Sequence, residues 1–299
     1  MYLESLWCEF ARFADKNFHD QIQRRGAFNS RVWEMRLAVV LKRLGLPVVE
    51  RASRGTSAGP DIKIDGETTI WIEAVAPATT SSIGDVYAEN LSRDCGTVDV
   101  PATTSSIGDV YASDLCGNDR APPELDVIIR YTGAFKEKWD GYRKYLENGV
   151  VKPTDAFVIA ISGANLRTPS LGPPPWMAKA LYGVGDFCFR TEVNTGRDLD
   201  SGWSHAPTRW KTAIASVESD LFLGPKRAEV SAVLHSYRNV FNLPVVQGQA
   251  EGRDFFVFHN QFASVPLTRG MVKLGQEWGT EDGWLKVLEN HWTTPTERS

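Results

Sequence analysis

The first candidate for chemistry is a carboxylate inside an apolar segment. In the stretch GPDIKIDGETTIWIEAVAP, residues 59–77, every position from Ile70 to Ala76 is apolar except Glu73. A strand that is apolar on both faces is usually covered on both sides, and burying an ionised carboxylate costs several kcal/mol unless a cation compensates it. The sequence therefore predicts that a positively charged side chain meets Glu73 in the fold.

A second carboxylate, Asp61, lies in the strand that precedes this segment, and the Asp65-Gly66 pair predicts a turn between the two strands. A two-residue turn pairs Asp61 with Ile70 and puts the two acids on opposite faces of the sheet. A three-residue turn or a bulge pairs Asp61 with Trp71, and Asp61 and Glu73 then share one face. In that second arrangement two hard oxygen ligands from neighbouring strands suit Mg²⁺.

Lys138 is the first candidate for the cation. It lies in a long predicted helix, 127–145, on which five residues form an apolar face: Tyr131, Ala134, Phe135, Tyr142 and Tyr145. At 100° per residue, Lys138 projects within about 20° of the centre of that face. If the face packs on the sheet, the ammonium must snorkel or find a carboxylate, and Asp61 with Glu73 offers one.

Two further basic residues are candidates for contact with a phosphate. Lys63 shares the strand face of Asp61 and is the alternative to Lys138 as the cation of the site. Arg130, near the start of the predicted helix, can reach a phosphate or a site acid. An exposed arginine at a helix start is more often an ordinary surface residue than a phosphate clamp.

The elements that position these residues follow from hydrophobic spacing. Residues 3–18 have helical spacing and predict an N-terminal arm, and Asn29 and Ser30 are N-cap types before a second helix that runs to Leu44. Further strands are predicted at 156–162, 186–191, 230–236 and 255–259. This order predicts an α/β fold with a mixed central sheet flanked by helices, and a β-rich C-terminal elaboration.

The domain organisation predicted from this order is an N-terminal helical arm, 1–28, and one domain, 29–299. The core of that domain is expected at 29–163 and the C-terminal elaboration at 164–299. The segment PATTSSIGDVYA at 77–88 recurs letter for letter at 101–112. Two identical copies rich in Thr, Ser and Gly indicate a tandem duplication in a surface loop and not a solenoid, so no chemistry is assigned to them.

The pattern resembles a known superfamily. Pro60-Asp61, followed by a strand that carries Glu73 and preceded by a helix that carries Glu34, resembles the PD-(D/E)XK nucleases with the restriction-endonuclease-like fold. The resemblance covers Asn29 to about Gly163. Several segments are similar to a bacterial family with this layout: RVWEMRLA, GPDI, IWIEAVAP, IIRYTGAFKEKWDGYRKYLENG, FVIAISG and FVFHN.

The resemblance implies a metal-dependent nuclease that hydrolyses phosphodiester bonds, with DNA as the substrate, in restriction, repair or mobile-element defence. It assigns Asp61 and Glu73 as ligands of Mg²⁺ or Mn²⁺, and Glu34 as a further ligand or a supporting acid. The superfamily has a lysine two residues after the strand acid, where this sequence has Val75. Lys138 on the helix is expected to replace that lysine.

Each assignment has a structural alternative. Glu73 can belong to a purely structural ion pair, Glu34 can lie on the solvated flank of its helix, and Lys138 can snorkel at a sheet edge. The alternative function is therefore a catalytically inactive, nuclease-like module that binds nucleic acid or a protein partner, with Val75 recording the loss of the catalytic lysine.

Composition limits the classes of protein that fit. The chain has 299 residues and a net charge of −4, which argues against a surface that is basic throughout and allows only a local basic groove. Four cysteines without paired metal-ligand spacing suggest a reducing, cytoplasmic compartment. No apolar run is long enough for a membrane span. Homodimers are common in the resembled superfamily, so a homodimer fits the resemblance.

Overall fold

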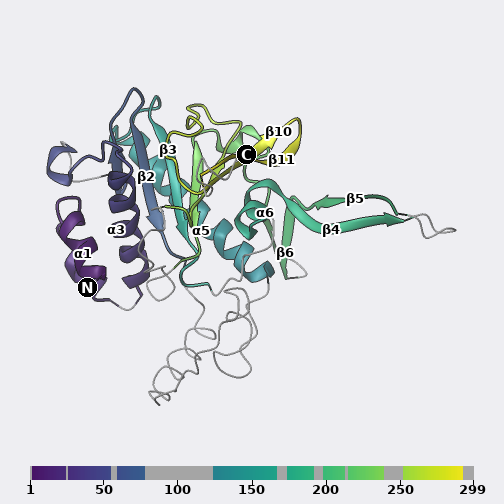
Figure 1. The fold of residues 1–299 in the computed structure, drawn as a ribbon, viewed down its shortest axis with the longest axis horizontal. Coiled ribbons are helices and arrows are strands. Elements are labelled where there is room, and N and C mark those ends of the chain that lie inside the picture. The colour runs from purple at the N-terminus through teal and green to yellow at the C-terminus, as the bar shows by residue number, and fades with distance from the viewer. Residues whose placement is uncertain are drawn as a thin grey trace, which may run out of the picture.

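The computed structural model shows helices packed on both faces of a central sheet (Figure 1). It describes residues 2–24, 26–54, 59–77, 124–166, 174–191, 198–212, 215–238 and 252–291. The duplicated segment lies outside the described residues except for Pro77, so the prediction of a surface loop there stays a prediction. Within the described residues, no helix is both long and apolar enough to cross a membrane.

The helices occur in two groups along the chain, before and after the first strands. The α-helices are α1 (Tyr2–Phe10), α2 (Phe18–Ile22), α3 (Phe28–Arg43), α5 (Glu124–Glu147) and α6 (Trp176–Tyr182). Two short 3-10 turns are η1 (Arg51–Arg54) and η2 (Pro225–Arg227). The predicted helices at Asn29–Leu44 and 127–145 correspond to α3 and α5.

A mixed seven-stranded sheet forms the centre, in the order β1-β2-β3-β8-β9-β10-β11. Its strands are β1 (Ile62–Ile64), β2 (Ile70–Val75), β3 (Ala156–Ser162), β8 (Ala232–Ser236), β9 (Phe256–His259), β10 (Gln276–Glu281) and β11 (Trp284–Asn290). Strands β2, β3 and β8 are parallel, as are β9 and β10, and the other neighbours are antiparallel. The predicted mixed α/β sheet is therefore confirmed.

The sheet is apolar on both faces because alternate residues of its central strands enter two separate cores. On β3, Ala156, Val158 and Ala160 pack in the core that contains α3. Phe157, Ile159 and Ile161 pack in the core that contains α5 and α6. All seven residues of β3 are buried. A centrally placed parallel strand covered on both sides requires this continuous apolar run.

The C-terminal part of the chain continues the same sheet. Strands β8 to β11 lie beyond residue 163, where the predicted core ended. Strand β8 pairs with β3, and β9, β10 and β11 follow it in the same sheet. Two separate hairpins precede them, β4 (Val184–Thr191) with β5 (Asp198–His205) and β6 (Thr208–Thr212) with β7 (Ala215–Glu218). The β4–β5 hairpin projects away from the body of the molecule (Figure 1).

The N-terminal arm is broken where the sequence predicts one continuous helix. The segment between α1 and α2 turns at Asp15, whose carboxylate accepts a hydrogen bond from the Asn17 amide at 2.7 Å, while its carbonyl accepts one from Phe18. Aspartate side chains compete in this way with helical hydrogen bonds. Both short helices pack on α3 through an aromatic cluster that includes Phe10 and Phe18.

Candidate active site

The β1–β2 hairpin decides whether Asp61 and Glu73 meet. The observed register pairs Ile62 with Ile72 and Ile64 with Ile70, so Asp65 to Thr69 form the connection. Neither of the two predicted turns occurs. Continuing this register by one residue puts Asp61 directly opposite Glu73, and opposite residues of an antiparallel pair share a face. The charge of Asp61 acts on Glu73, as the arrangement with both acids on one face requires, although the pairing of Asp61 with Trp71 expected for that arrangement is wrong.

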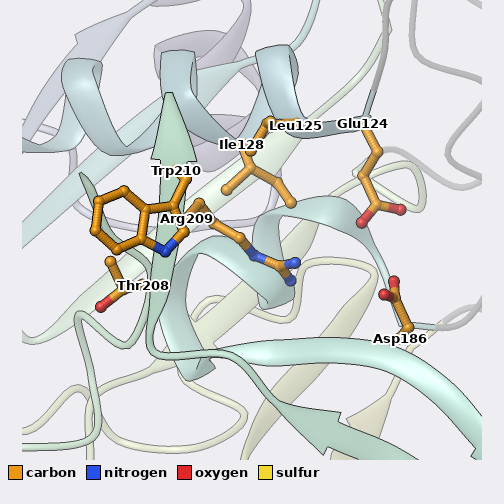
Figure 2. A pocket seen from close by; sticks show the side chains of 7 residues that line it. All are labelled: Glu124, Leu125, Ile128, Asp186, Thr208, Arg209 and Trp210. Carbon is orange, nitrogen blue, oxygen red and sulfur yellow. The ribbon is translucent and has the colours of Figure 1, made fainter. Parts of the chain in front are cut away.

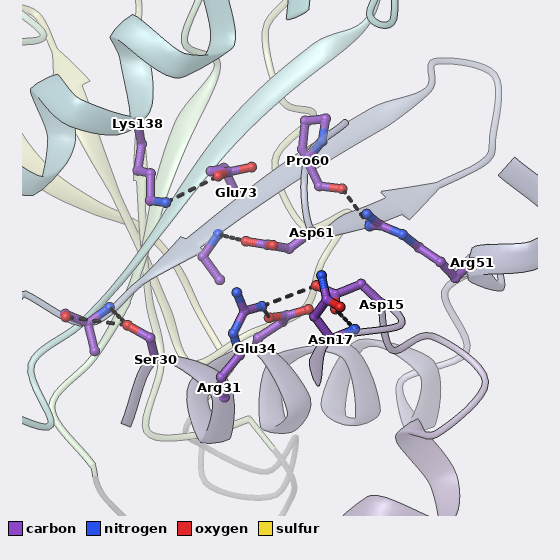
Figure 3. Close-up of polar contacts among 12 residues, drawn as sticks. Asp15, Asn17, Ser30, Arg31, Glu34, Arg51, Pro60, Asp61, Glu73 and Lys138 are labelled. Carbon is purple, nitrogen blue, oxygen red and sulfur yellow. Dashed lines mark hydrogen bonds and ion pairs between the residues drawn. The ribbon is translucent and has the colours of Figure 1, made fainter. Parts of the chain in front are cut away.

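Glu73 lies on the face of β2 that α5 covers. Its neighbours at alternate positions, Trp71 and Val75, pack in the core around α5. The side chain of Glu73 is only 12% exposed, and its Oε1 lies 3.2 Å from the Nζ of Lys138 (Figure 3). The prediction that a cation meets Glu73, and that Lys138 supplies it, is confirmed.

Lys138 reaches the acid because α5 presents its apolar face to the sheet. Tyr131, Phe135 and Tyr142 are fully buried on that face, and Tyr142 stacks on Phe157 of β3 with the ring centroids 3.8 Å apart. The Lys138 side chain is 20% exposed. Its aliphatic part therefore follows the packed face while its ammonium reaches the carboxylate.

Asp61 is held by the main chain of the neighbouring strand. Its Oδ2 accepts a hydrogen bond from the Ala74 amide at 2.8 Å (Figure 3). Asp61 precedes the first residue of β1, so here a side chain and not the backbone extends the contact between β1 and β2. The Asp61 carboxylate therefore points to the main chain of β2 and does not turn away into solvent.

Glu34 comes to the same edge from α3. It is 3% exposed, and its Oε2 accepts a hydrogen bond from the Arg31 guanidinium at 2.5 Å. Arg31 also lies 3.6 Å from Asp15 of the N-terminal arm (Figure 3). Glu34 is thus a buried acid with its own cation, and the alternative of a solvated helix flank is wrong.

Burial dominates the electrostatics of these acids. Burial and, second, the charge of Asp61 together raise the pKa of Glu73 to about 8, against the opposing effect of Lys138. Burial also raises the pKa of Asp61, against the Ala74 hydrogen bond and the charge of Lys138. For Glu34, burial and the charge of Asp61 raise the pKa well above its usual value, while Arg31 lowers it. Burial therefore favours the protonated form of all three acids, and a nearby cation opposes this effect.

The same field acts on Lys138 in the opposite direction. Burial by itself lowers the pKa of this ammonium, but the charges of Glu73 and Asp61 outweigh the burial and raise it. Lys138 therefore remains a cation and a hydrogen-bond donor at neutral pH.

The other two predicted basic residues lie away from the acid pair. The Lys63 ammonium lies 2.8 Å from Asp65, at the turn end of the hairpin, and 5.6 Å from the centre of the Trp71 ring. Arg130 is half-buried on α5, eight residues before Lys138, which is about 12 Å along the helix axis. Of the two candidate lysines, the structure brings only Lys138 into contact with the acids.

Four residues near the acids are not among the site residues predicted from the sequence. Arg31 pairs with Glu34, while Arg51 and Arg54 of η1 donate hydrogen bonds to the Pro60 carbonyl at 3.5 and 3.0 Å. Burial and the charges of Glu73 and Asp61 raise the pKa of Tyr145 to about 12. Tyr145 lies seven residues after Lys138 on the same helical face, and that spacing is the one sequence signal that points to any of them.

An open cavity lies elsewhere in the described part of the molecule. A cavity of about 490 Å³ is lined by Glu124, Leu125, Ile128, Asp186, Thr208, Arg209 and Trp210 (Figure 2). It lies between the first turns of α5 and strand β6, and it shares no residue with the acid pair. Two of its charged groups already have partners, because Glu124 binds Lys179 at 2.8 Å and Arg209 donates to the Val184 carbonyl at 2.6 Å. The cavity therefore does not include the acid pair, and the candidate active site is identified by the converging acids instead.

Comparison of the chain with protein-family models, with curated protein sequences and with solved structures found no match in any of the three. The arrangement of Asp61, Glu73 and Lys138 is therefore the basis on which a function is assigned.

Proposed function

We propose that the protein is a metal-dependent nuclease that hydrolyses phosphodiester bonds, with DNA as its substrate. The observation that carries the proposal is the contact of Lys138 with Glu73 beside Asp61, two carboxylates and an ammonium from three different elements at one sheet edge. A purely structural ion pair requires one acid, whereas this cation faces two. Like charges that are buried together are typical of sites that bind cations or carry out proton transfer.

A divalent cation is compatible with the residues present. Glu73 Oε2 is buried and, within the described part of the chain, has no hydrogen-bond partner. Asp61 uses Oδ2 for the Ala74 amide, which leaves its second oxygen for another ligand. Among the described residues, no cluster of three or more acids, histidines or cysteines has metal-binding geometry. Two carboxylates completed by water match the way Mg²⁺ is usually bound, so Asp61 and Glu73 would hold Mg²⁺ or Mn²⁺.

The bound ion would supply Lewis-acid stabilisation of the charge that develops on the phosphate. The residues of the chain would orient the substrate and balance the charge of the acids. Lys138 is a permanent donor beside the acids and can orient an anionic oxygen of the substrate. Asp61 is fixed by the Ala74 amide, which limits the reorganisation required when a substrate binds. The Glu34–Arg31 pair lies behind Asp61 and makes Glu34 a supporting acid in this proposal.

The order of elements supports the same function. Helix α3, strands β1 and β2, helix α5 and strand β3 follow each other in the order expected for the restriction-endonuclease-like arrangement. Glu34 lies on α3, Asp61 directly before β1, and Glu73 on β2. In this proposal Lys138 replaces the lysine that the superfamily has at the position of Val75.

Cleavage of mixed DNA in the presence of Mg²⁺ or Mn²⁺ tests the proposal. We expect the wild-type protein to cut, and Glu73→Ala and Asp61→Asn to lose at least about a hundredfold of the rate, because oriented electrostatic groups are worth that much. Glu67→Ala, an exposed acid in the turn of the same hairpin, is the matched control and should cut normally. Cleavage that survives Glu73→Ala would remove the assignment.

Val75 favours one second candidate, a nuclease-like module that binds nucleic acid without cutting it. The valine is half-buried and packs against the core around α5, as a residue without a catalytic role would. DNA binding by the wild-type protein with no cleavage in either metal would favour this candidate over the nuclease.

A further inference from the structure

Arg54 contacts the peptide that carries Asp61. It ends the η1 turn, and its side chain is buried, with 8% of the residue exposed. One guanidinium nitrogen donates to the Pro60 carbonyl at 3.0 Å, and the other donates to the Asp61 carbonyl at 2.7 Å. The two carbonyls belong to consecutive residues, so the planar guanidinium binds both at once in a fork.

The environment of Arg54 is unusual for a buried cation. Within the described residues it has no carboxylate in hydrogen-bond contact, and its Nε is buried without a partner. Buried charges are normally paired, because desolvation costs several kcal/mol. Here the negative charges of Asp61 and Glu34 act on Arg54 from a distance. The guanidinium therefore adds positive charge near the acids without itself binding a carboxylate oxygen.

Asp61 needs such a contact because it lies outside the regular sheet. Strand β1 begins at Ile62, so the backbone of Asp61 precedes the β1–β2 ladder. Its carboxylate is tied to the Ala74 amide, and its carbonyl is tied to Arg54. Releasing the carbonyl removes one of the backbone contacts that hold Asp61 and leaves the bond to Ala74 dependent on a rotatable side chain.

We infer that Arg54 is the positioning residue for Asp61: its fork on the Pro60 and Asp61 carbonyls holds the Asp61 carboxylate on the Ala74 amide and beside Glu73. The importance of this role for catalysis rests on the proposed nuclease function. The geometric part does not, because the Asp61–Ala74 hydrogen bond exists in the free protein.

Amide hydrogen exchange measured by NMR tests the geometric part without metal or substrate. We expect the Ala74 amide to exchange at least tenfold faster in Arg54→Met than in the wild type. The Ser231 amide, which bonds to the Phe157 carbonyl at 2.7 Å on the far side of β3, should keep its rate. Arg54→Lys keeps the charge without the fork and should fall between the two.

Arg51→Met is the matched control, because it also removes a cation from η1. The hydrogen bond from Arg51 to the Pro60 carbonyl, at 3.5 Å, is longer than the one from Arg54, at 3.0 Å. Its Ala74 amide should exchange at the wild-type rate. Unchanged exchange of Ala74 in Arg54→Met would overturn the inference. So would equal acceleration of Ala74 and Ser231 in both Arg54 variants, because the residue would then support the whole fold and not Asp61.

Mn²⁺ titration by calorimetry tests the catalytic part. We expect Arg54→Met to bind Mn²⁺ at least fivefold more weakly, Arg54→Lys to recover part of the affinity, and the cleavage rate at saturating Mn²⁺ to change less than the affinity. Wild-type affinity in Arg54→Met would overturn the link to the site. A wild-type protein that binds no Mn²⁺ would instead count against the nuclease proposal, and the Ala74 exchange rate would then decide the role of Arg54.

Discussion

The ammonium of Lys138 lies 3.2 Å from Glu73 Oε1, although 65 positions separate the two residues in the chain. Strand β2 brings the acid into the core and helix α5 brings the cation over it. The pair exists because each residue is buried on an otherwise apolar face, where neither charge is stable without the other.

Removing both members of this pair should cost less than the sum of the single removals. Lys138→Met leaves the buried Glu73 without its cation and Glu73→Gln leaves the ammonium without its acid, whereas the double variant leaves neither. We expect a coupling energy of about 0.5–3 kcal/mol in a double-mutant cycle measured by urea unfolding. Lys136→Met, at an exposed position on the same helix, is the control. Additive effects would contradict a coupled pair.

The pKa of Glu73 makes stability depend on pH. Between its ordinary value of 4.5 and about 8, folded Glu73 keeps a proton that the unfolded chain releases. The free energy of unfolding should therefore fall as pH rises through this window, by at most about 1.4 kcal/mol per pH unit for one group. Glu73→Gln removes this contribution, so urea unfolding of the variant and the wild type should diverge in slope from about pH 5 to about pH 8. Parallel curves would show that the pKa is not raised.

Metal binding should release protons. A divalent cation between Asp61 and Glu73 must displace the proton that burial favours on Glu73, whose pKa is raised to about 8. Below that pH we expect Mn²⁺ affinity to weaken by up to about tenfold per pH unit. Calorimetry in two buffers with different ionisation enthalpies counts the protons directly. Affinity that does not vary between about pH 6 and about pH 8 would argue against ligation by Glu73.

A lysine introduced at position 75 should partly replace Lys138. Val75 lies on the same face of β2 as Glu73, where the resembled superfamily has its lysine. We expect Lys138→Met to lower the DNA cleavage rate by about 10²–10⁴-fold, a typical contribution for one positioned catalytic side chain. Val75→Lys in that background should recover at least tenfold, and Val75→Met should recover nothing. Equal rates for the two double variants would contradict a shared role for the two positions.

Much of the scaffold follows from local patterns. The apolar run at 156–162 predicts a buried strand, and β3 has the same bounds, Ala156–Ser162. The helical spacing after residue 127 correctly places Lys138 on the face that meets the sheet. Hydrophobic periodicity works here because the two cores on either side of the sheet require continuous apolar faces.

Polar residues at the ends of elements depend on tertiary partners that the local sequence does not specify. Asn29 and Ser30 predict a helix cap, yet α3 begins at Phe28 and no side chain caps it. Ser30 Oγ accepts a hydrogen bond from the Ala76 amide at 2.9 Å, and Asn29 donates to Asn165. Both residues tie α3 to the ends of β2 and β3. Short polar side chains bond whatever tertiary partner lies nearest, and local sequence does not specify that partner.

The sequence by itself determined that a carboxylate would be buried in a strand, that a lysine would project from an apolar helix face, and that a cation had to compensate the acid. These follow from the cost of burying charge and from helical and strand periods, which act over a few residues. Only the tertiary structure decided the hairpin register that sets Asp61 opposite Glu73, the pairing of Glu34 with Arg31, and the fork of Arg54 on the backbone before β1. Those depend on which segments distant in the chain pack together, because register and buried hydrogen bonds are selected by the whole core and not by neighbouring residues.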